Sequence, residues 1–285
     1  MSIQFLGDHA IPPEVTIAAS NKGLGRATAA HRVPHRMGTE EEAAKEKSAE
    51  RRQGVLVFGA IASPLAIGLL LWWATGSPGL GIGVGVVLTL VAWGVSFYFM
   101  NRDGDGDDED RDRVYVFGEG FALPPRDGVP ARAFTWDEVE ALHRFVTDTY
   151  VARRLVVTGH VYKLVLAGGE LVVFHGAEQP DKVSPTDVLQ LGPLLEKEIF
   201  ERRLPPAVEA INAGRTVTFG ALALSASGIT TPAGLAPWNT VRDLSTSAGH
   251  VVIAAAGGKP GMYAIGDIPN FEVFWTLAQN LWAQH

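Results

Sequence analysis

The chain has 285 residues, with 24 Lys and Arg against 31 Asp and Glu, which gives a formal net charge of −7. It contains no cysteine, which excludes disulfides, thiolate catalysis and cysteine-based metal sites. Charged residues make up 19% of the chain, compared with about 25% in typical soluble domains. The deficit is local, because residues 53–101 contain no Asp, Glu, Lys, Arg or His.

The first 53 residues are polar, with few aromatic side chains and no sustained hydrophobic period. This composition predicts that residues 1–38 are mostly disordered. From Thr39 onward the pattern TEEEAAKEKSAERR favours a helix, because Thr39 and Glu42 have the spacing of a capping box. Residues 1–53 are therefore interpreted as a disordered tail followed by a juxtamembrane helix.

Two long apolar runs follow, residues 54–74 and residues 79–100, separated by four residues without charge. A helix of 21 residues is about 31 Å long, which matches the hydrocarbon core of about 30 Å. The alternative is a pair of buried helices in a soluble core, but such helices rarely lack charge on every face. The sequence predicts a two-helix transmembrane hairpin over residues 54–100.

Basic residues flank both ends of this hairpin, while the turn has none. Lys and Arg favour the cytoplasmic side, so the prediction is a multi-pass protein of the inner (cytoplasmic) membrane with both termini in the cytoplasm. Four glycines alternate at the start of the second span: Gly79, Gly81, Gly83 and Gly85. Their spacing is typical of close helix packing, either against the first span or against another copy in a homo-oligomer.

Residues 101–113 are strongly acidic and read NRDGDGDDEDRDR. The alternating Asp residues suggest a calcium loop, but such a loop needs Gly at its sixth position and Glu at its twelfth. Those positions hold Asp108 and Val114. The segment is interpreted as a hydrated acidic linker rather than a metal site.

The remaining sequence repeats itself with an offset of 102 residues. Eight identities occur over residues 113–142, including Phe117-Gly118 with Phe219-Gly220 and Trp136 with Trp238. The pattern W-x-x-V-x-x-L is the most specific part of this match. The repeat predicts two domains, residues 114–214 and residues 215–285.

Each repeat is expected to be rich in strands and to end in a helix. In the first, Gly168-Gly169 predicts a hairpin turn. A helix is expected after Ser184, with an apolar stripe of Val188, Leu191, Leu195 and Ile199, and with a break or kink at Pro205-Pro206. In the second, Asn270 is the expected cap of the final helix.

About six or seven antiparallel strands followed by one helix resembles the pleckstrin-homology-like fold, a bent sheet or barrel closed by a helix. With the preceding hairpin, the arrangement looks like an uncharacterised bacterial family of two-span membrane proteins with tandem cytoplasmic domains of this kind. The resemblance covers roughly residues 54–285 and rests on structural motifs. It implies a fold class of a membrane α-hairpin plus α+β, with two tandem pleckstrin-homology-like antiparallel sheet or barrel domains, each closed by a C-terminal helix.

A search for chemistry finds no catalytic motif, so the protein is expected not to be an enzyme and to need no cofactor. His31 and His35 have the spacing of a zinc pair, but Pro34 disfavours the helix that this pair requires. His143, His160 and His175 would form a metal site if their strands brought them together, although solvent-facing or core histidines are the commoner outcome. No metal site is therefore predicted.

Residues 114–285 hold 13 basic and 17 acidic side chains, a balance that argues against nucleic acid as a partner. Arg153-Arg154 is a tight basic cluster in this region. It is either a solvated loop tip or a contact for anionic lipid or an acidic partner.

The favoured function is a membrane-anchored, non-enzymatic cytoplasmic interaction or regulatory module, with the lipid bilayer and an unknown protein as partners. The alternatives are a subunit of a small oligomeric membrane channel or transporter, and an enzyme with a pocket at His143 or His175.

Overall fold

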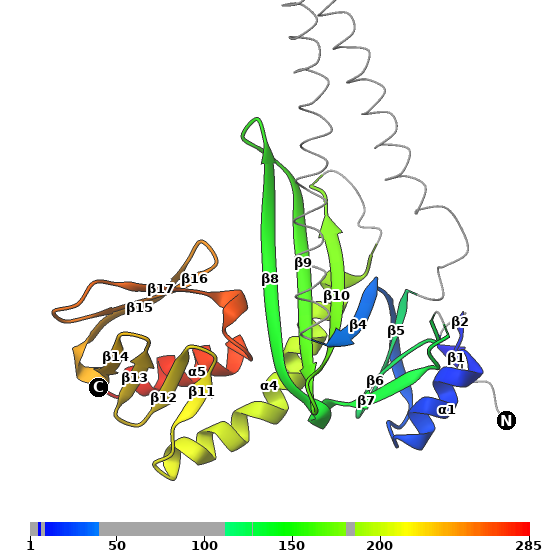
Figure 1. Ribbon diagram of the computed structural model, residues 1–285, viewed down its shortest axis with the longest axis horizontal. Coiled ribbons are helices and arrows are strands. Elements are labelled where there is room, and N and C mark those ends of the chain that lie inside the picture. Colours follow the sequence, from blue (N-terminus) through cyan, green and yellow to red (C-terminus); the bar gives the residue numbers. More distant parts are fainter. Residues whose placement is uncertain (1–4, 7–8, 40–111, 127, 181–185) are drawn as a thin grey trace, which may run out of the picture. The chain divides into compact units, whose positions relative to one another are not determined.

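The computed structural model describes residues 5–6, 9–39, 112–126, 128–180 and 186–285 (Figure 1). Met1–Gly38 and Glu109–His285 form one compact unit, to which the elements below belong apart from the last residue of β4. The predicted juxtamembrane helix, the hairpin of residues 54–100 and most of the acidic linker lie outside the described residues.

The described ranges contain no helix that is both long enough and apolar enough to cross a membrane. The longest helix, α4 (Val188–Asn212), has 25 residues but carries seven charged side chains. These ranges form mostly antiparallel β-structure, with four sheets of three or four strands and three α-helices. The predicted fold class with its membrane α-hairpin is therefore corrected to this mostly antiparallel β-fold. The predicted multi-pass inner-membrane location is corrected as well, because no helix in the described ranges could cross a membrane.

The first lobe comprises residues 9–39 and 112–200 and contains two four-stranded antiparallel sheets, ordered β3-β5-β6-β7 and β4-β10-β9-β8. The bounds of its elements are α1 (Pro13–Asn21), β2 (His9–Ala10), β3 (Ala27–Arg32), β4 (His35–Thr39), β5 (Arg113–Phe117), β6 (Gly120–Leu123), β7 (Arg132–Thr135), the 3-10 helix η1 (Trp136–Glu138), β8 (Val139–Val151), β9 (Arg154–Leu166) and β10 (Glu170–Glu178). A short strand β1 (Phe5–Leu6) pairs with β2.

The β3-β5-β6-β7 sheet is buried on both faces. Successive side chains of a strand point to opposite sides, so each strand contributes to two different cores. In β5, Val114 and Val116 enter the main core, whereas Tyr115 and Phe117 enter a smaller cluster with α1. Small side chains on the outer face, such as Ala122, let α1 approach closely. Hydrophobic residues on both faces of β5 therefore explain why α1 covers this sheet.

The predicted disorder of residues 1–38 is wrong for the part that the structure describes. Strand β3 pairs with β5, and β4 adds to the other sheet beside β10. Val33, between the two strands, is fully buried, and the amide of His175 donates to the carbonyl of Pro34 at 2.9 Å. The N-terminal segment thus joins both sheets of the first lobe.

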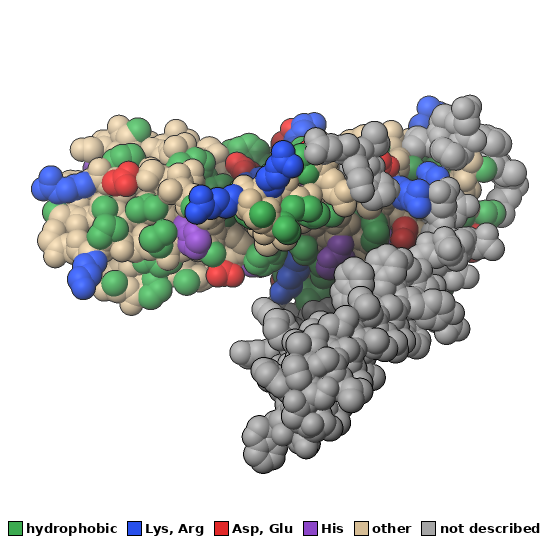
Figure 2. All heavy atoms as spheres, turned by 90° about the horizontal axis from the view of Figure 1, so that it is seen from above, with side chains coloured by type: hydrophobic (Ala, Val, Ile, Leu, Met, Phe, Trp, Pro, Cys, Tyr) green, Lys and Arg blue, Asp and Glu red, His purple; other side chains and the backbone are tan. Residues whose placement is uncertain are grey.

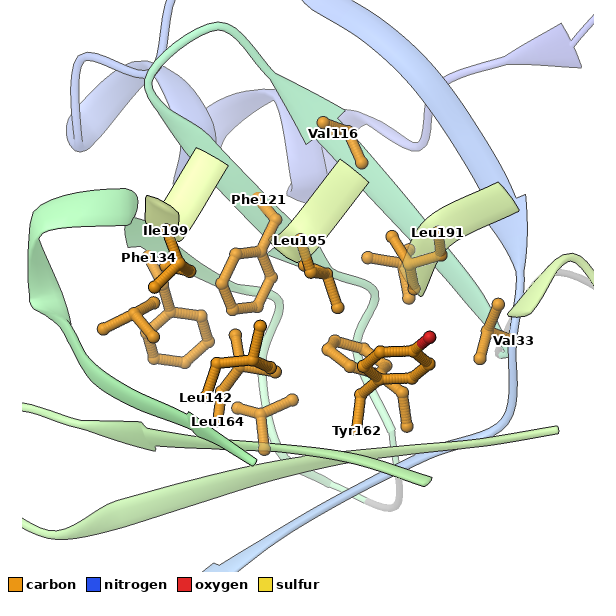
Figure 3. Close-up of a cluster of buried hydrophobic side chains, with 14 of the residues drawn as sticks. Val33, Val116, Phe121, Phe134, Leu142, Tyr162, Leu164, Leu191, Leu195 and Ile199 are labelled. Carbon is orange, nitrogen blue, oxygen red and sulfur yellow. The ribbon is translucent and has the colours of Figure 1, made fainter. Parts of the chain in front are cut away.

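The main core of this lobe lies between its two sheets and α4 (Figure 3). The helix contributes Val188, Leu191, Leu195 and Ile199, which are at most 1% exposed. In Figure 3, Leu191 and Leu195 face Leu164 and Tyr162 across this core. The predicted apolar stripe of the helix is confirmed.

The second lobe, residues 201–285, contains a four-stranded sheet β11-β12-β13-β14 and a three-stranded sheet β15-β16-β17. The bounds of its elements are β11 (Val217–Phe219), β12 (Leu222–Ser225), β13 (Gly228–Thr231), β14 (Gly234–Pro237), η2 (Trp238–Thr240), β15 (Val241–Ser247), β16 (His250–Ala255), β17 (Gly261–Ala264), η3 (Ile265–Asp267) and α5 (Phe271–Trp282). Its core includes Trp238 and the apolar face of α5, with Phe274 and Ala278 fully buried.

Helix α4 is shared between the lobes (Figure 1). Ile199 packs in the core of the first lobe, while Ile211 packs in the core of the second. The sequence predicted a break or a kink at Pro205-Pro206; a break does not occur, because the helix continues through both prolines to Asn212. An interior proline costs a helix about 3 kcal/mol or more, and burial of the second half of α4 against the second core offsets part of that cost.

Candidate interaction surface

Strands β8 and β9 form a long ribbon of 13 residues on each side. Strand β10 pairs with β9 as far as the Glu178–Thr158 pair, whereas β8 and β9 continue together to the Val151–Arg154 pair. Figure 1 shows the two strands extending beyond the end of β10. Beyond Thr158 the ribbon therefore has two strands.

The end of this ribbon is exposed and rich in apolar side chains. Residues 145–156 are exposed without interruption. The large hydrophobic side chains among them are Phe145, Val146, Tyr150, Val151, Leu155 and Val156, which are 38 to 61% exposed. They are half of the twelve exposed large hydrophobic side chains in the described part of the chain.

Both faces of the ribbon carry apolar groups. Tyr150 lies opposite Leu155, and the next pair, Val151 and Arg154, points to the other face. The register shifts between Thr149 and Tyr150, which leaves Val156 as the extra residue of a bulge. A ribbon with apolar side chains on both faces has no purely polar side. We name residues 145–157 the ribbon surface.

The predicted contact residues Arg153 and Arg154 lie at the tip of this ribbon. Ala152 and Arg153 form the turn, with φ angles of 49° and 66°, and Arg154 begins β9. Positive φ at both turn residues matches the twist of the hairpin but usually selects Asn or Gly. Figure 2 shows the molecule of Figure 1 from above, and on the face seen there basic and hydrophobic side chains lie next to one another.

The base of the ribbon is held by polar contacts with α4 and the second lobe. Arg144 donates from Nη1 to Glu196 Oε1 at 2.8 Å, and the same nitrogen lies 3.8 Å from Glu272 Oε1. His143 Nδ1 lies 2.8 Å from the carbonyl oxygen of Gly266. These contacts fix the direction of the ribbon where it leaves the sheet.

Burial dominates the protonation of the groups near Arg144. It raises the pKa of Glu196, although Arg144 opposes this change and Glu272 adds to it. Burial, together with the negative charge of Glu196, also raises the pKa of the Tyr162 hydroxyl to about 12. Tyr162 therefore stays neutral at pH 7.

The three strand histidines do not converge. His160 lies opposite Val146 and Gly176, and His175 lies opposite Val161. Adjacent residues of a strand point to opposite faces, so His160 lies on one face of the sheet and His143 and His175 lie on the other. No group of three or more side chains suited to hold a metal ion occurs within the described ranges.

The remaining predicted site residues, Gly79, Gly81, Gly83 and Gly85, lie outside the described residues. Arg153 and Arg154 were predicted from the sequence as a candidate contact, but the apolar ribbon around them was not. A signal was present, because FVTDTYVARRLVV has apolar residues at both odd and even positions. This pattern indicates a strand pair with two apolar faces.

The described residues define a two-lobed, β-rich fold with a shared helix and a projecting ribbon. The chain belongs to a family of unknown function (DUF6585), whose match covers residues 28–284. Comparisons with curated proteins and with solved structures gave no match. The resemblance to tandem pleckstrin-homology-like proteins stays a prediction.

Proposed function

We propose that this protein is a non-enzymatic interaction module that binds an acidic and apolar segment of a partner protein through the ribbon surface. The observation that carries the proposal is the run of exposed residues 145–156, which holds six large exposed hydrophobic side chains. A contiguous exposed apolar patch on a folded protein usually marks an interaction site.

The energetics of the ribbon favour a bound partner. A two-stranded hairpin alone is marginally stable in water, and here its apolar side chains gain nothing from exposure. Covering them removes apolar area from water, worth about 25 cal/mol per Å² before the entropy of binding is subtracted. The ordered base at Arg144 means that little freedom of the ribbon's direction is lost on binding.

Charge and backbone geometry define the chemistry of the partner. Arg153 and Arg154 stand at the tip of a chain whose net charge is −7, so an acidic segment is attracted to the tip rather than to the molecule as a whole. The edge of β9 beyond Thr158 continues past its pairing with β10. A peptide strand can pair with such an edge through backbone hydrogen bonds, which a lipid surface cannot provide.

A photo-crosslinking amino acid at Tyr150 in the full chain would identify the partner in cells of its source. The purified partner would then be titrated against the unmodified chain, an Arg153→Glu/Arg154→Glu variant and a Tyr150→Ser/Val151→Ser variant. Each variant is expected to weaken binding by at least tenfold, because one reverses the tip charge and the other removes apolar area.

Matched changes elsewhere serve as controls. Leu235→Ser and Met262→Ser alter side chains of similar exposure in the second lobe, and Lys259→Glu reverses a charge there. These controls should bind like the unmodified chain. Equal loss in ribbon and control variants would contradict the proposal. Binding of the isolated chain to phosphatidylglycerol vesicles, with Arg153 and Arg154 required and no protein partner, would replace it with a lipid contact.

The alternative of a channel or transporter subunit depends on residues 79–100, which lie outside the described residues. The alternative of an enzyme depends on a pocket at His143 or His175. Neither histidine lines the cavity between β4 and the β6–β7 connection or the small cavity beside Arg144. No described residue favours either alternative over binding by the ribbon surface.

A further inference from the structure

Two histidines are buried in the segment that joins the two sheets of the first lobe. His31, in β3, is 8% exposed, and His35, the first residue of β4, is 4% exposed. No other histidine, and no acidic or basic side chain, is buried to this degree in the described part of the chain. We name residues 27–39, which contain β3 and β4, the strap.

The His31 ring lies on the core face of β3 without a hydrogen-bond partner. His31 pairs with Val114 of β5, and directly opposite residues of neighbouring strands share a face. The ring therefore points toward the main core, to which Val114 belongs. Both ring nitrogens are buried and unpaired. A buried polar group without a partner is costly, and a buried charge without a partner costs far more.

The charges around His31 do not compensate for its burial. Asp187, the N-cap of α4, acts on the ring, but its Oδ2 already accepts a hydrogen bond from the amide of Arg32 at 2.8 Å. The N-terminal end of a helix also disfavours a nearby cation. On β5, Arg113 pairs with Arg32 and so lies on the opposite face from the ring. Burial therefore outweighs Asp187 and lowers the pKa of His31.

The His35 ring is held in its neutral form as well. Its Nδ1 lies 3.3 Å from the carbonyl oxygen of Val33, which can only accept, and its neighbour on β10 is the uncharged ring of Phe174. Burial is the largest influence and lowers the pKa of His35. The bond to Val33 and the charge of Asp112 oppose this change, whereas the charge of Arg126 adds to it.

Backbone hydrogen bonds hold the strap to the rest of the first lobe. Besides the pairing of β3 with β5, the amide of Val33 donates to the carbonyl of Asp112 at 2.7 Å, and the amide of His175 donates to the carbonyl of Pro34 at 2.9 Å. The amide of Asp187 donates to the carbonyl of Arg32 at 2.8 Å. The nitrogens of His31 therefore reach water only if the strap parts from the start of α4.

We propose that the strap is an acid-sensitive latch: protonation of His31 and His35 releases residues 27–39 from both sheets, while the rest of the first lobe stays folded. Release uncovers the edges of β5 and β10, which β3 and β4 cover in the closed state. An uncovered edge can pair with a strand of another chain. The inference does not depend on the partner proposed for the ribbon surface.

The direction of the response follows from proton binding. In the docked strap both rings are neutral, whereas in the released strap they titrate near the ordinary histidine pKa of about 6.5. The released state therefore binds more protons than the docked state as the pH falls through this value, and acid favours release. The stabilisation of the docked strap is fully present above about pH 6.5 and is lost below it.

Hydrogen exchange of the full chain at pH 7.5 and pH 5, corrected for the intrinsic exchange rates, tests the proposal, because it measures opening segment by segment. At pH 5, the protection of residues 27–39 should fall at least fivefold more than that of β9 and of the second lobe. Unchanged protection of the strap would overturn the proposal. An equal loss throughout the first lobe would also overturn it, because acid would then unfold the lobe as a whole.

Three leucine variants assign the response. His31→Leu and His35→Leu each remove one titrating ring, so each should reduce the acid-induced loss of protection in the strap. His250→Leu is the control, because His250 lies in the second lobe, where its Nδ1 is 2.9 Å from the carbonyl oxygen of Ala248. This control should respond like the unmodified chain. An undiminished response in whichever of His31→Leu and His35→Leu folds would overturn the proposal.

Discussion

Asn270 and Leu142 join the two lobes through a reciprocal pair of hydrogen bonds. The amide of Asn270 donates to the carbonyl of Leu142 at 2.8 Å, and the amide of Leu142 donates to Asn270 Oδ1 at 2.9 Å. Asn270 Nδ2 also donates to the carbonyl of Glu140 at 3.1 Å. Asn270 thus provides hydrogen-bond partners for backbone groups at the edge of β8, as a neighbouring strand would, at the base of the ribbon.

Replacing Asn270 should destabilise the contact between the lobes by an amount that depends on the new residue. Asn270→Gly removes two side-chain hydrogen bonds, worth about 0.5–1.5 kcal/mol each, but tolerates the left-handed backbone at φ = 52°. Asn270→Ala loses the same bonds and adds about 1–2 kcal/mol of backbone strain. Urea unfolding should rank the unmodified chain first, Asn270→Gly second and Asn270→Ala last.

The exposed Asn212 at the end of α4 provides the control for this series. Asn212→Ala should change the free energy of unfolding by less than about 0.5 kcal/mol, as surface changes usually do. If Asn270→Gly proves as stable as the unmodified chain, the side-chain bonds to β8 contribute nothing measurable.

The carboxyl of Glu196 is expected to make the protein less stable as the pH rises. Its pKa is raised by burial, which outweighs the opposing effect of Arg144 at 2.8 Å. A carboxyl with a higher pKa in the folded state binds more protons folded than unfolded between the two pKa values. Its contribution to stability therefore falls as pH rises from the ordinary value of about 4.3 through the raised value.

Glu196→Gln removes this titration and tests the sign. The difference in free energy of unfolding, variant minus unmodified chain, should become more favourable to the variant between pH 4 and pH 7, by about 1.4 kcal/mol per unit of pKa change. Urea unfolding at several pH values in this range measures it. A difference that instead favours the unmodified chain more strongly at pH 7 would show that the ion pair with Arg144 outweighs burial.

Local periodicity made α4 and the turn between β9 and β10 predictable. The buried stripe of α4 follows a helical period, which can be recognised from a short stretch of sequence without knowledge of distant contacts. Gly168 and Gly169 form the predicted turn, with φ angles of 92° and 82°. The sequence also named Asn270 as a helix cap, but its side chain bonds to β8 instead of to the helix.

The features that sequence reasoning missed depend on contacts between distant residues. Strand β3 reads ATAAHR, which has no strong strand pattern of its own and becomes a strand by pairing with β5, more than 80 residues away. The cavity between β4 and the β6–β7 connection likewise brings together segments that lie more than 80 residues apart, such as Met37 and Leu123. Arg153 and Arg154 could be named as a candidate contact from the sequence, because the two residues are adjacent in the chain.

The paired glycines of the sequence repeat should respond differently to the same substitution. Gly118 has open space around the position of an added Cβ, whereas an added Cβ at Gly220 would lie 2.8 Å from the carbonyl oxygen of Asp267. Gly220 also has φ = 63°, which costs an alanine about 1–2 kcal/mol. Gly118→Ala should be neutral or slightly stabilising, and Gly220→Ala should lower the free energy of unfolding by more than this strain.

Thermal and urea unfolding of the two alanine variants would measure the difference. Because Gly118 directly follows β5 at Phe117 and Gly220 directly follows β11 at Phe219, the two glycines hold matching positions in the repeat, and each serves as the matched control for the other. Equal effects of the two substitutions would contradict the different backbone geometries.

The two repeated tryptophans should also differ, through a single hydrogen bond. Trp136 and Trp238 are both almost fully buried at the start of a 3-10 helix. Trp238 Nε1 donates to the carbonyl of Ser225 at 3.0 Å, whereas Trp136 Nε1 is buried without an acceptor among the described residues. Substitution by Phe removes a similar volume at both positions, so the difference between the variants isolates the indole N–H.

Trp238→Phe should therefore destabilise the protein more than Trp136→Phe, by about 1–3 kcal/mol. The first change breaks a bond and leaves the Ser225 carbonyl with one partner fewer, while the second removes a buried donor that has no acceptor, and an unpaired buried group carries a penalty of about 1–3 kcal/mol. Urea unfolding with an unchanged slope against denaturant gives the comparison. A larger loss in Trp136→Phe would mean that its indole nitrogen has a partner in solution, such as a bound water.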